Sequence, residues 1–223
     1  MQEKPFEIQH PNLLLVEGKD DKWLLDQLLS QLGIQDVQTH WVESKDKFAA
    51  FLRLLPKRVN EFELLRTISL VVDADESRSK AFAELLSALR ASALPVPVEV
   101  GKFGPGVPSV LIECIPPGEA SGTLEDLLLP PIEAMIGEMP CWPDFRQCLG
   151  REMERSKSFN EARWNKIKLQ LILNCSGRGL HKGIINAFQS REYRDILQSP
   201  YLEPLRELLR QVQAEGERRR DGR

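Results

Sequence analysis

Short apolar segments of the chain alternate with longer segments in which apolar residues recur at helical spacing. The run from Asn12 to Val16 has no polar alternation, which is typical of a strand buried on both faces of a parallel sheet. The following segment ends at Gly33 and repeats leucines on one helical face, namely Leu24, Leu25, Leu28, Leu29 and Leu32. These positions predict a strand, a tight turn and a helix.

The same alternation continues further along the chain. Strands are expected at residues 37–42, 67–72 and 109–115, with an edge strand at the alternating Val96, Val98 and Val100. Helices are expected between them, one capped by Ser44 and ending before Pro56, and one over residues 82–89. Strands that alternate with helices predict an α/β fold with a mostly parallel sheet flanked by helices.

The second half of the chain has a helical and more polar pattern. A helix is expected to start at Thr123 and to be interrupted by Pro130-Pro131. Further helices are expected at residues 143–154, 160–173, 182–190 and 202–213, followed by a frayed tail at residues 218–223. We therefore expect two units, an α/β domain at residues 1–138 and an α-helical extension at residues 139–223, packed on or beside it.

Composition places the chain among ordinary globular proteins. Of its 223 residues, 42% are hydrophobic and 28% are charged. The net charge of −3 supplies no general attraction for nucleic acid, so such a partner requires a local basic patch. The four cysteines form no C-x-x-C pair, and no stretch approaches the ~20 apolar residues of a membrane span. A cytoplasmic protein without a membrane partner is expected.

Acidic residues stand where two of the expected strands end. Glu17 follows the first strand, Asp73 closes the strand at 67–72, and Asp75 comes two residues later. The carboxyl ends of parallel strands meet at one edge of the sheet, where ligands bind. Clustered carboxylates repel one another unless a cation neutralises them, and Mg²⁺ prefers oxygen ligands. Glu17, Asp73 and Asp75 are therefore candidate ligands of Mg²⁺ or Mn²⁺.

The order of these motifs carries a family resemblance over roughly residues 12 to 130. A strand ending in Glu17-Gly18 and a later strand ending in Asp73-Ala74-Asp75 resemble the Toprim superfamily of primases, topoisomerases, recombination proteins and nucleases. The run from Val16 to Asp21 is similar to the opening motif of the Toprim ribonuclease that matures small ribosomal RNA. In total size the chain resembles small stand-alone Toprim-like proteins of unknown function.

The resemblance implies a Toprim-like fold and phosphoryl-transfer chemistry on nucleic acid. It assigns Glu17 as general acid/base or metal ligand, and Asp73 and Asp75 as the residues that hold Mg²⁺ against a phosphate. The overcoming-lysogenisation-defect nucleases have two further acidic positions, which Asp21 and Glu125 could match. The predicted catalytic residues are Glu17, Asp73 and Asp75, and the predicted metal ligands also include Asp21 and Glu125.

Other features of the superfamily are absent from the sequence. No Tyr or Ser is placed as topoisomerases require, and neither a zinc-finger cysteine set nor an ATPase segment is present. Lys19, Lys166 and Lys168 are candidates for a catalytic lysine, but each is better explained as a solvated surface charge, so none is assigned.

Each acidic residue also has a purely structural interpretation. Glu17 could be a strand-end residue bonded to backbone amides, and Asp75 could cap a helix that begins near Ser77. Asp21 could stabilise the first helix by placing negative charge at the positive end of its dipole, and Asp126 is better explained as a helix cap than as a metal ligand.

Three functions compete on this evidence. The first is a Mg²⁺- or Mn²⁺-dependent nuclease acting on DNA or RNA. The second is a catalytically silent Toprim-like binding module, whose helical C-terminal half binds a protein or a nucleic acid. The third is a phosphatase of the haloacid-dehalogenase type with Asp73 as nucleophile, but there the Asp pair ends the first strand, whereas here a Glu-Gly strand precedes it.

Overall fold

A single parallel sheet forms the centre of the protein. The computed structural model describes residues 6–58, 62–137, 141–154, 161–175, 184–185 and 195–221. The sheet has the order β2-β1-β3-β4, and every neighbouring pair is parallel. Its strands are β1 (Asn12–Val16), β2 (Val37–Trp41), β3 (Thr67–Asp73) and β4 (Ser109–Ile115). The predicted α/β fold with a parallel sheet is confirmed.

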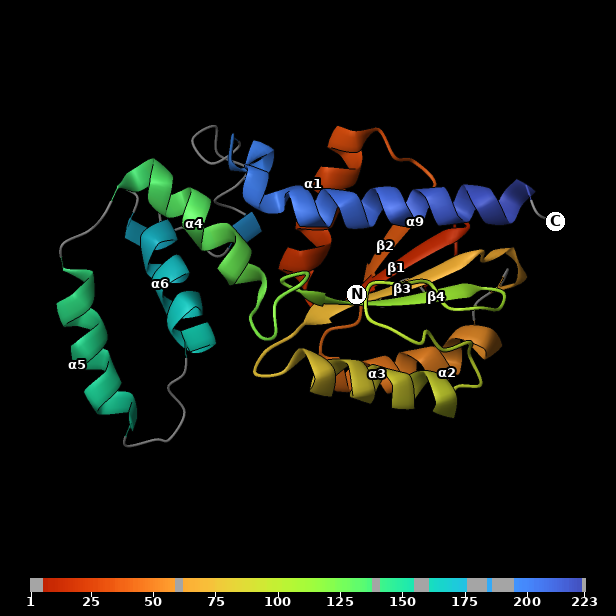
Figure 1. Cartoon of the computed structure of the whole chain (residues 1–223), viewed down its shortest axis with the longest axis horizontal. Helices are drawn as coiled ribbons and strands as arrows, with labels where there is room; N and C mark the ends of the chain where they lie inside the picture. The colour runs from red at the N-terminus through yellow and green to blue at the C-terminus, as the bar shows by residue number, and fades with distance from the viewer. Residues whose placement is uncertain are drawn as a thin grey trace.

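Helices cover both faces of this sheet (Figure 1). One face carries α1 (Lys19–Leu32) and the long α9 (Glu203–Asp221), and the other carries α2 (Phe48–Arg58) and α3 (Arg78–Ala91). Successive strand residues point to opposite faces, so Leu14 packs in the α1–α9 core and Leu15 in the α2–α3 core. Both cores exclude water, which explains why β1, β3 and β4 are buried on both faces, whereas the edge strand β2 is only partly buried.

The remaining helices extend beyond one end of the sheet (Figure 1). They are α4 (Leu124–Ile136), α5 (Trp142–Glu154) and α6 (Glu161–Cys175). Four short 3₁₀ helices complete the described elements: η1 (Lys45–Lys47), η2 (Phe62–Leu64), η3 (Asp195–Gln198) and η4 (Pro200–Leu202).

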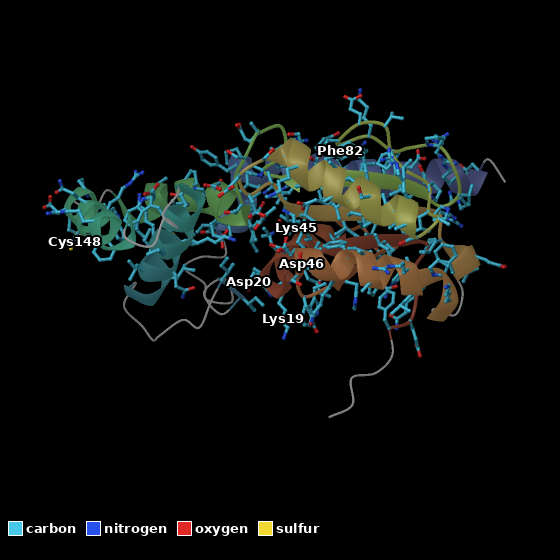
Figure 2. The ribbon with its side chains drawn as sticks, turned by 90° about the horizontal axis from the view of Figure 1, so that it is seen from below. Lys19, Asp20, Lys45, Asp46, Phe82 and Cys148 are labelled. Atoms are coloured by element: carbon cyan, nitrogen blue, oxygen red, sulfur yellow. The ribbon has the colours of Figure 1, made fainter. Side chains whose placement is uncertain are left out.

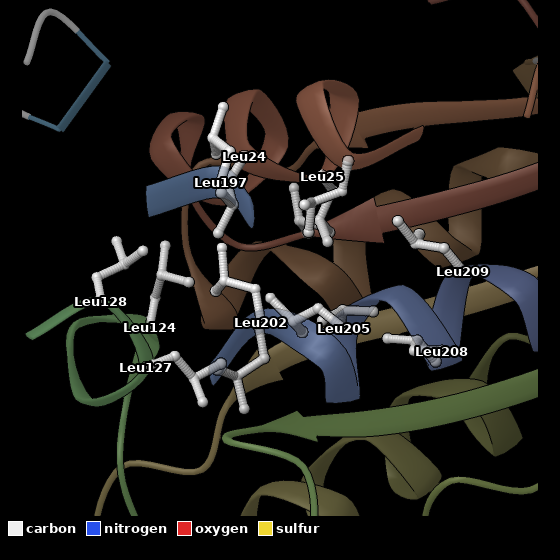
Figure 3. Close-up of a cluster of buried hydrophobic side chains, with 14 of the residues drawn as sticks. Leu24, Leu25, Leu124, Leu127, Leu128, Leu197, Leu202, Leu205, Leu208 and Leu209 are labelled. Carbon is white, nitrogen blue, oxygen red and sulfur yellow. The ribbon is translucent and has the colours of Figure 1, made fainter. Parts of the chain in front are cut away.

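A leucine-rich core joins the C-terminal segment to the sheet. Leucines of α1, α4, η3, η4 and α9 converge in it (Figure 3), and Leu202, Leu205 and Leu209 are fully buried. The predicted extension at residues 139–223 therefore contributes a helix, α9, to one face of the sheet. The division of the chain at residue 138 stays a prediction.

The expected edge strand around Val96, Val98 and Val100 is wrong. This segment follows the open side of β4 and reaches it through separate bonds, from Gly101 N to Ile112 O at 2.8 Å and from Gly104 N to Val110 O at 2.8 Å. Pro95 and Pro97 lack the N–H groups that a ladder needs, and Val98 is 83% exposed. Val96 and Val100 pack at the margin of the α2–α3 core, but without a continuous ladder to β4 the segment is not a strand.

Two expected helix ends also differ from the structure. The helix α4 continues through Pro130-Pro131 to Ile136, because the fixed proline φ suits a helix and Leu128, Pro131 and Ile132 are buried in the core. The described part of the tail is helical to Asp221, so its predicted fraying is wrong there. Both Arg218 and Arg219 pair with Glu215, which holds this last turn in place.

The helix α2 also continues past its predicted end to Arg58, with Pro56 inside it. The helix predicted at residues 182–190 falls outside the described residues, apart from residues 184–185.

A close contact fixes α9 against the start of β1. Gly216 lies over the fully buried Asn12, whose amide donates to Asp36 Oδ2 at 2.9 Å and accepts from Thr67 Oγ1 at 3.0 Å. A Cβ at Gly216 would lie 2.6 Å from Asn12 Cγ and closer still to the amide oxygen and nitrogen. Glycine allows this approach although it is a poor helix former.

We expect Gly216→Ala to destabilise the protein. Alanine improves helix propensity by about 1 kcal/mol, but overpacking against the bonded Asn12 costs about 1–3 kcal/mol, so the net loss should be up to about 2 kcal/mol. Urea unfolding measures the difference, with Glu217→Ala on the exposed side of α9 as a control that changes stability by less than about 0.5 kcal/mol. A Gly216→Ala protein that is more stable than wild type would contradict the close contact.

Candidate functional site

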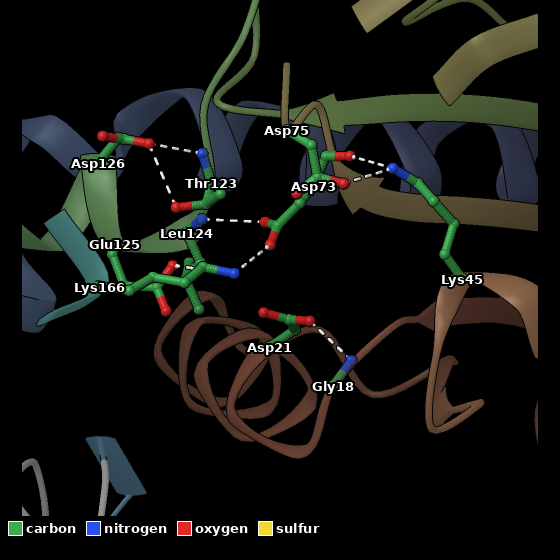
Figure 4. Close-up of polar contacts among 10 residues, drawn as sticks. All are labelled: Gly18, Asp21, Lys45, Asp73, Asp75, Thr123, Leu124, Glu125, Asp126 and Lys166. Atoms are coloured by element: carbon green, nitrogen blue, oxygen red, sulfur yellow. Dashed lines mark hydrogen bonds and ion pairs between the residues drawn. The ribbon is translucent and has the colours of Figure 1, made fainter. Parts of the chain in front are cut away.

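The acidic residues singled out from the sequence lie at the carboxyl edge of the sheet. Glu17 follows β1, Asp73 ends β3, and these two strands are neighbours. Asp21 lies in the first turn of α1 and Glu125 in the first turn of α4. The charges of Asp75, Glu17, Asp21 and Glu125 each raise the pKa of another acid in this group, and three of them act on Asp73, so the five acids share one region. Figure 4 shows four of them, Asp21, Asp73, Asp75 and Glu125.

Asp73 has the most constrained carboxylate of the group. Its Oδ1 accepts a hydrogen bond from the Leu124 amide at 3.0 Å, at the positively polarised start of α4. Its Oδ2 lies 3.4 Å from Lys166 Nζ. Burial raises the pKa of Asp73 well above its usual value, and the neighbouring Asp21 raises it further, while Lys166 opposes the change. Holding this group ionised therefore requires nearby positive charge.

Asp21 combines a structural bond with an unfavourable charge. Its Oδ2 accepts from the Gly18 amide at 2.8 Å, which satisfies the N-cap amide at the start of α1. Burial raises the pKa of Asp21 to about 6, the Gly18 bond lowers it, and the charges of Glu17 and Glu125 raise it. The cap interpretation of Asp21 is thus correct, and the same side chain also belongs to the acidic region.

Glu17 and Glu125 carry oxygens that the protein leaves unsatisfied. Burial raises the pKa of Glu17, and the nearby Lys45 charge lowers it. Glu17 Oε2 and Glu125 Oε2 are both buried and have no hydrogen-bond partner among the described residues. Buried acceptors without a donor are costly, so both oxygens favour a cationic ligand.

Lys166 is a member of the site that the sequence did not single out from the other lysines. From α6 its Nζ lies 3.4 Å from Asp73 Oδ2 and 3.9 Å from Glu125 Oε2. Burial lowers the pKa of Lys166, but Glu125 and Asp73 together outweigh this effect and raise it. The other two candidate lysines lie elsewhere: Lys168 pairs with Glu133, and Lys19 stacks 4.4 Å above the ring of Trp41.

Lys45 is a second lysine of the site, and the sequence analysis missed it. Its Nζ donates to Asp75 Oδ2 at 2.8 Å and to the Asp73 carbonyl oxygen at 3.0 Å. Figure 2 shows it on the main body of the molecule, at the end nearer to the helix α5 that carries Cys148. A signal was available, because Lys45 begins η1, the first element after β2, and the carboxyl end of β2 meets the same edge as that of β1.

Asp75 has an unusual backbone conformation rather than a capping role. Its φ is 51°, and its N–H and C=O pair with Gly122 at 2.7 and 2.8 Å. Ser77 caps α3 through a bond from Lys80 N to Ser77 Oγ at 3.3 Å, so the alternative reading of Asp75 as this cap is wrong. The Gly122 pair instead holds the start of α4 beside Asp73.

Asp126 is a cap, as expected. Its Oδ2 accepts from the Thr123 amide at 2.6 Å, and Asn165 of α6 donates to its Oδ1 at 2.5 Å. The bond to Asn165 holds α6 against α4, and Lys166 is the next residue along α6. Asp126 therefore helps to position the lysine without joining the acidic group.

The oxygen groups of the site are chemically suited to a divalent cation, but the carboxylates that the structure describes are not spaced to bind one. Hard carboxylate oxygens and buried unsatisfied acceptors are what Mg²⁺ or Mn²⁺ prefers. Within the described parts of the chain, however, no group of three or more His, Cys, Asp or Glu side chains is arranged to hold a metal ion. The metal and catalytic roles of Glu17, Asp21, Asp73, Asp75 and Glu125 therefore stay predictions.

Fold and site together define a parallel α/β protein with an acidic, lysine-bordered site at the carboxyl edge of its sheet. The chain belongs to the family described as "Protein of unknown function (DUF3226)", whose model matches residues 11–211. No curated protein matches it. None of the helices in the described ranges is long and apolar enough to cross a membrane.

Several solved structures resemble the chain. A hypothetical protein of Pyrococcus horikoshii, PH0156, is 16% identical with a TM-score of 0.54, over 93% of this chain and 99% of the other. The C-terminal region of the Burkholderia pseudomallei OLD protein is 13% identical with a TM-score of 0.45, over 92% and 100%. That of Xanthomonas campestris pv. campestris is 13% identical with a TM-score of 0.44, over 96% and 98%. The first of these likenesses supports the fold.

The raised pKa of Asp21 predicts a pH dependence of stability. Its folded pKa of about 6 exceeds the usual 3.8, so the folded state binds more protons between these values and stability falls as pH rises through them. Asp21→Asn keeps an oxygen acceptor for Gly18 and removes this loss, which amounts to at most about 3 kcal/mol. Relative to wild type, the variant should be more stable at pH 7.5 than at pH 4.

Urea unfolding across this pH range measures the effect. Asp144→Asn, an exposed position on α5, is the matched control and should follow the wild-type profile. A stability difference between Asp21→Asn and wild type that does not change with pH would show that Asp21 is not destabilised by its ionisation.

Proposed function

We propose that this protein catalyses Mg²⁺- or Mn²⁺-dependent phosphoryl transfer on nucleic acid, as a nuclease acting on DNA or RNA. One observation carries the proposal: carboxylates from the ends of two strands and the starts of two helices surround Asp73, with the Lys166 ammonium group against it. A site of this kind offers oxygen ligands to a cation and a positive charge to a phosphate.

The balance of charge supports a cation at this site. Six carboxylates, with Asp20 coupled to Asp21 and Glu125, face two ammonium groups, so the two lysines neutralise at most two of the acids. The pKa values of Glu17, Asp21 and Asp73 are all raised, with burial as the main cause. A bound cation would remove this destabilisation, because the acids could ionise without mutual repulsion.

In this proposal Glu17, Asp73 and Asp75 hold the cation, with Asp21 and Glu125 beside them. The bound ion supplies polarisation of a phosphoryl oxygen and neutralisation of its charge. Glu17 has an alternative role as general acid or base, because away from the cation its pKa is raised by burial, which suits a group that takes or gives a proton. Lys166 stays protonated, since its acidic neighbours raise its pKa, and it stabilises negative charge on the phosphate.

A second function is favoured by a specific contact. Lys45 already satisfies Asp75, and Lys166 already pairs with Asp73, which is how a catalytically silent site would be neutralised. In that case the protein is a binding module, and its helical C-terminal half engages a protein or nucleic-acid partner. Metal binding without turnover would favour this alternative.

We expect Asp73→Asn to abolish metal-dependent cleavage. Asparagine keeps the oxygen that accepts from Leu124, so the fold should survive while the central negative charge is lost. The measurements are calorimetric titration with Mg²⁺ or Mn²⁺ and cleavage of labelled DNA and RNA by purified protein. Asp144→Asn controls for the charge change. A wild-type protein that neither binds these ions nor cuts either substrate would refute the enzyme proposal.

Lys166→Gln should lower the cleavage rate by about 10²-fold or more while leaving metal binding in place, because it removes the positive charge next to Asp73 and no carboxylate. Lys168→Gln is the matched control two residues away on α6, where the lysine pairs with Glu133. Single-turnover rates at saturating metal separate the two variants. Equal rates for both would remove Lys166 from the mechanism.

A further inference from the structure

Lys45 places a second ammonium group at the acidic site, in addition to that of Lys166. It is a long cationic side chain, only 20% exposed, placed by the short turn η1 against the Asp73-Ala74-Asp75 segment. Lys166 already forms an ion pair with Asp73 from the opposite side (Figure 4). Two lysines thus border the same acidic segment, and they come from elements far apart in the sequence.

The bonds of Lys45 leave part of its capacity free for a ligand. An ammonium group has three donors, and two of them are directed at Asp75 Oδ2 and the Asp73 carbonyl oxygen. Lys47, on the same turn, instead pairs with Glu43 and lines a different pocket. The two neighbouring lysines therefore have separate surroundings.

Lys45 lines a pocket of about 410 Å³ next to the acidic site. The charged residues of this Lys45 pocket are Lys45, Lys80, Lys166, Asp75, Glu76 and Glu84. Ser77, the N-cap of the 14-residue α3, also lines it and brings the positive end of that helix to the wall. The volume lies within the range of small-ligand pockets, about 300–1,000 Å³.

The charges of the pocket indicate what it can hold. Lysine ammonium groups bind phosphates as point charges, and a chain with a net charge of −3 needs such a local group to attract nucleic acid. The pocket reaches from Lys45 to Lys166, past Asp75, so a phosphate in it lies beside the acidic site. The three acids of the wall would repel that phosphate unless a cation neutralises Asp75 and its neighbours.

We propose that the Lys45 pocket is a subsite for a backbone phosphate of a nucleic-acid strand, bound by Lys45 and Lys80 and coupled to a divalent cation at the neighbouring carboxylates. This inference rests on the proposed function and identifies where its substrate lies. Coupling is reciprocal, so the cation strengthens phosphate binding and the strand strengthens cation binding by the same factor.

The test is the salt dependence of oligonucleotide binding. Fluorescence anisotropy measures the affinity of labelled single-stranded DNA and RNA of one sequence, about 12 nucleotides long, in saturating Ca²⁺ and in EDTA. We expect tighter binding in Ca²⁺. Lys45→Gln and Lys80→Gln should each reduce the slope of log K against log salt by about 0.7–1, because one phosphate contact is lost. Lys47→Gln should leave the slope unchanged.

The variants separate phosphate binding from a structural role. If Lys45 only positions Asp75, then Lys45→Gln weakens Ca²⁺ binding but leaves the slope at saturating Ca²⁺ unchanged, and this result would overturn the proposal. Lys80→Gln keeps the bond between Lys45 and Asp75 and so reports on the phosphate alone. The absence of oligonucleotide binding by wild type in Ca²⁺ would overturn it too.

Cleavage in Mg²⁺ is measured separately on the same oligonucleotides. Binding with a slope that depends on Lys45, but without cleavage, supports the subsite and refutes the nuclease. Cleavage with equal slopes for wild type and Lys45→Gln refutes the subsite and leaves the nuclease standing. The DNA and RNA arms identify which strand the subsite accepts.

Discussion

Burial of clustered carboxylates, reinforced by their mutual repulsion, is the constraint around which this end of the protein is organised. Parallel strands bring Glu17 and Asp73 to one edge, and the helices that follow add Asp21 and Glu125. Each acid that loses water there raises the cost of ionising the others. Only positive groups can balance this cost, and the start of α4 and two lysines, Lys45 and Lys166, supply them.

The apolar core makes this arrangement possible by fixing the elements that carry the charges. The α1–α9 core extends through η3 and η4 to α4, so the start of α4 is held where it can meet Asp73 (Figure 3). On the other face, Arg78 pairs with the buried Glu113 at 2.7 Å and donates to the Cys114 and Pro116 carbonyl oxygens. This ion pair secures the loop whose Gly122 pairs with Asp75.

The two lysines give the site a chemical asymmetry. Lys166 approaches Asp73 and Glu125 from α6, whereas Lys45 approaches Asp75 from the turn after β2. A phosphate and a metal ion need opposite charges from the protein, and here both kinds of charge occur within one small region. The same lysines that neutralise the acids are therefore placed to meet an anionic substrate once a cation takes over that neutralisation.

Local patterns determined most of what the sequence could reveal. Short segments rich in apolar and β-branched residues identified the four strands. The ends of two of them placed Glu17, Asp73 and Asp75 on one edge, because parallel strands all end at the same edge of the sheet. The expected strand at Val96 to Val100 was wrong because two prolines remove its donors. Burial of α4, a tertiary property, let Pro130-Pro131 remain inside a helix.

The lysines show what only the tertiary structure decided. Nothing in the local sequence separates Lys166 from Lys168, since the choice depends on which face of α6 meets α4. Lys166 is 93 positions from Asp73, and a contact over that separation exists only once the core has packed. The sequence by itself determined where the acidic residues cluster. The packing of helices distant in the sequence decided which lysines neutralise them.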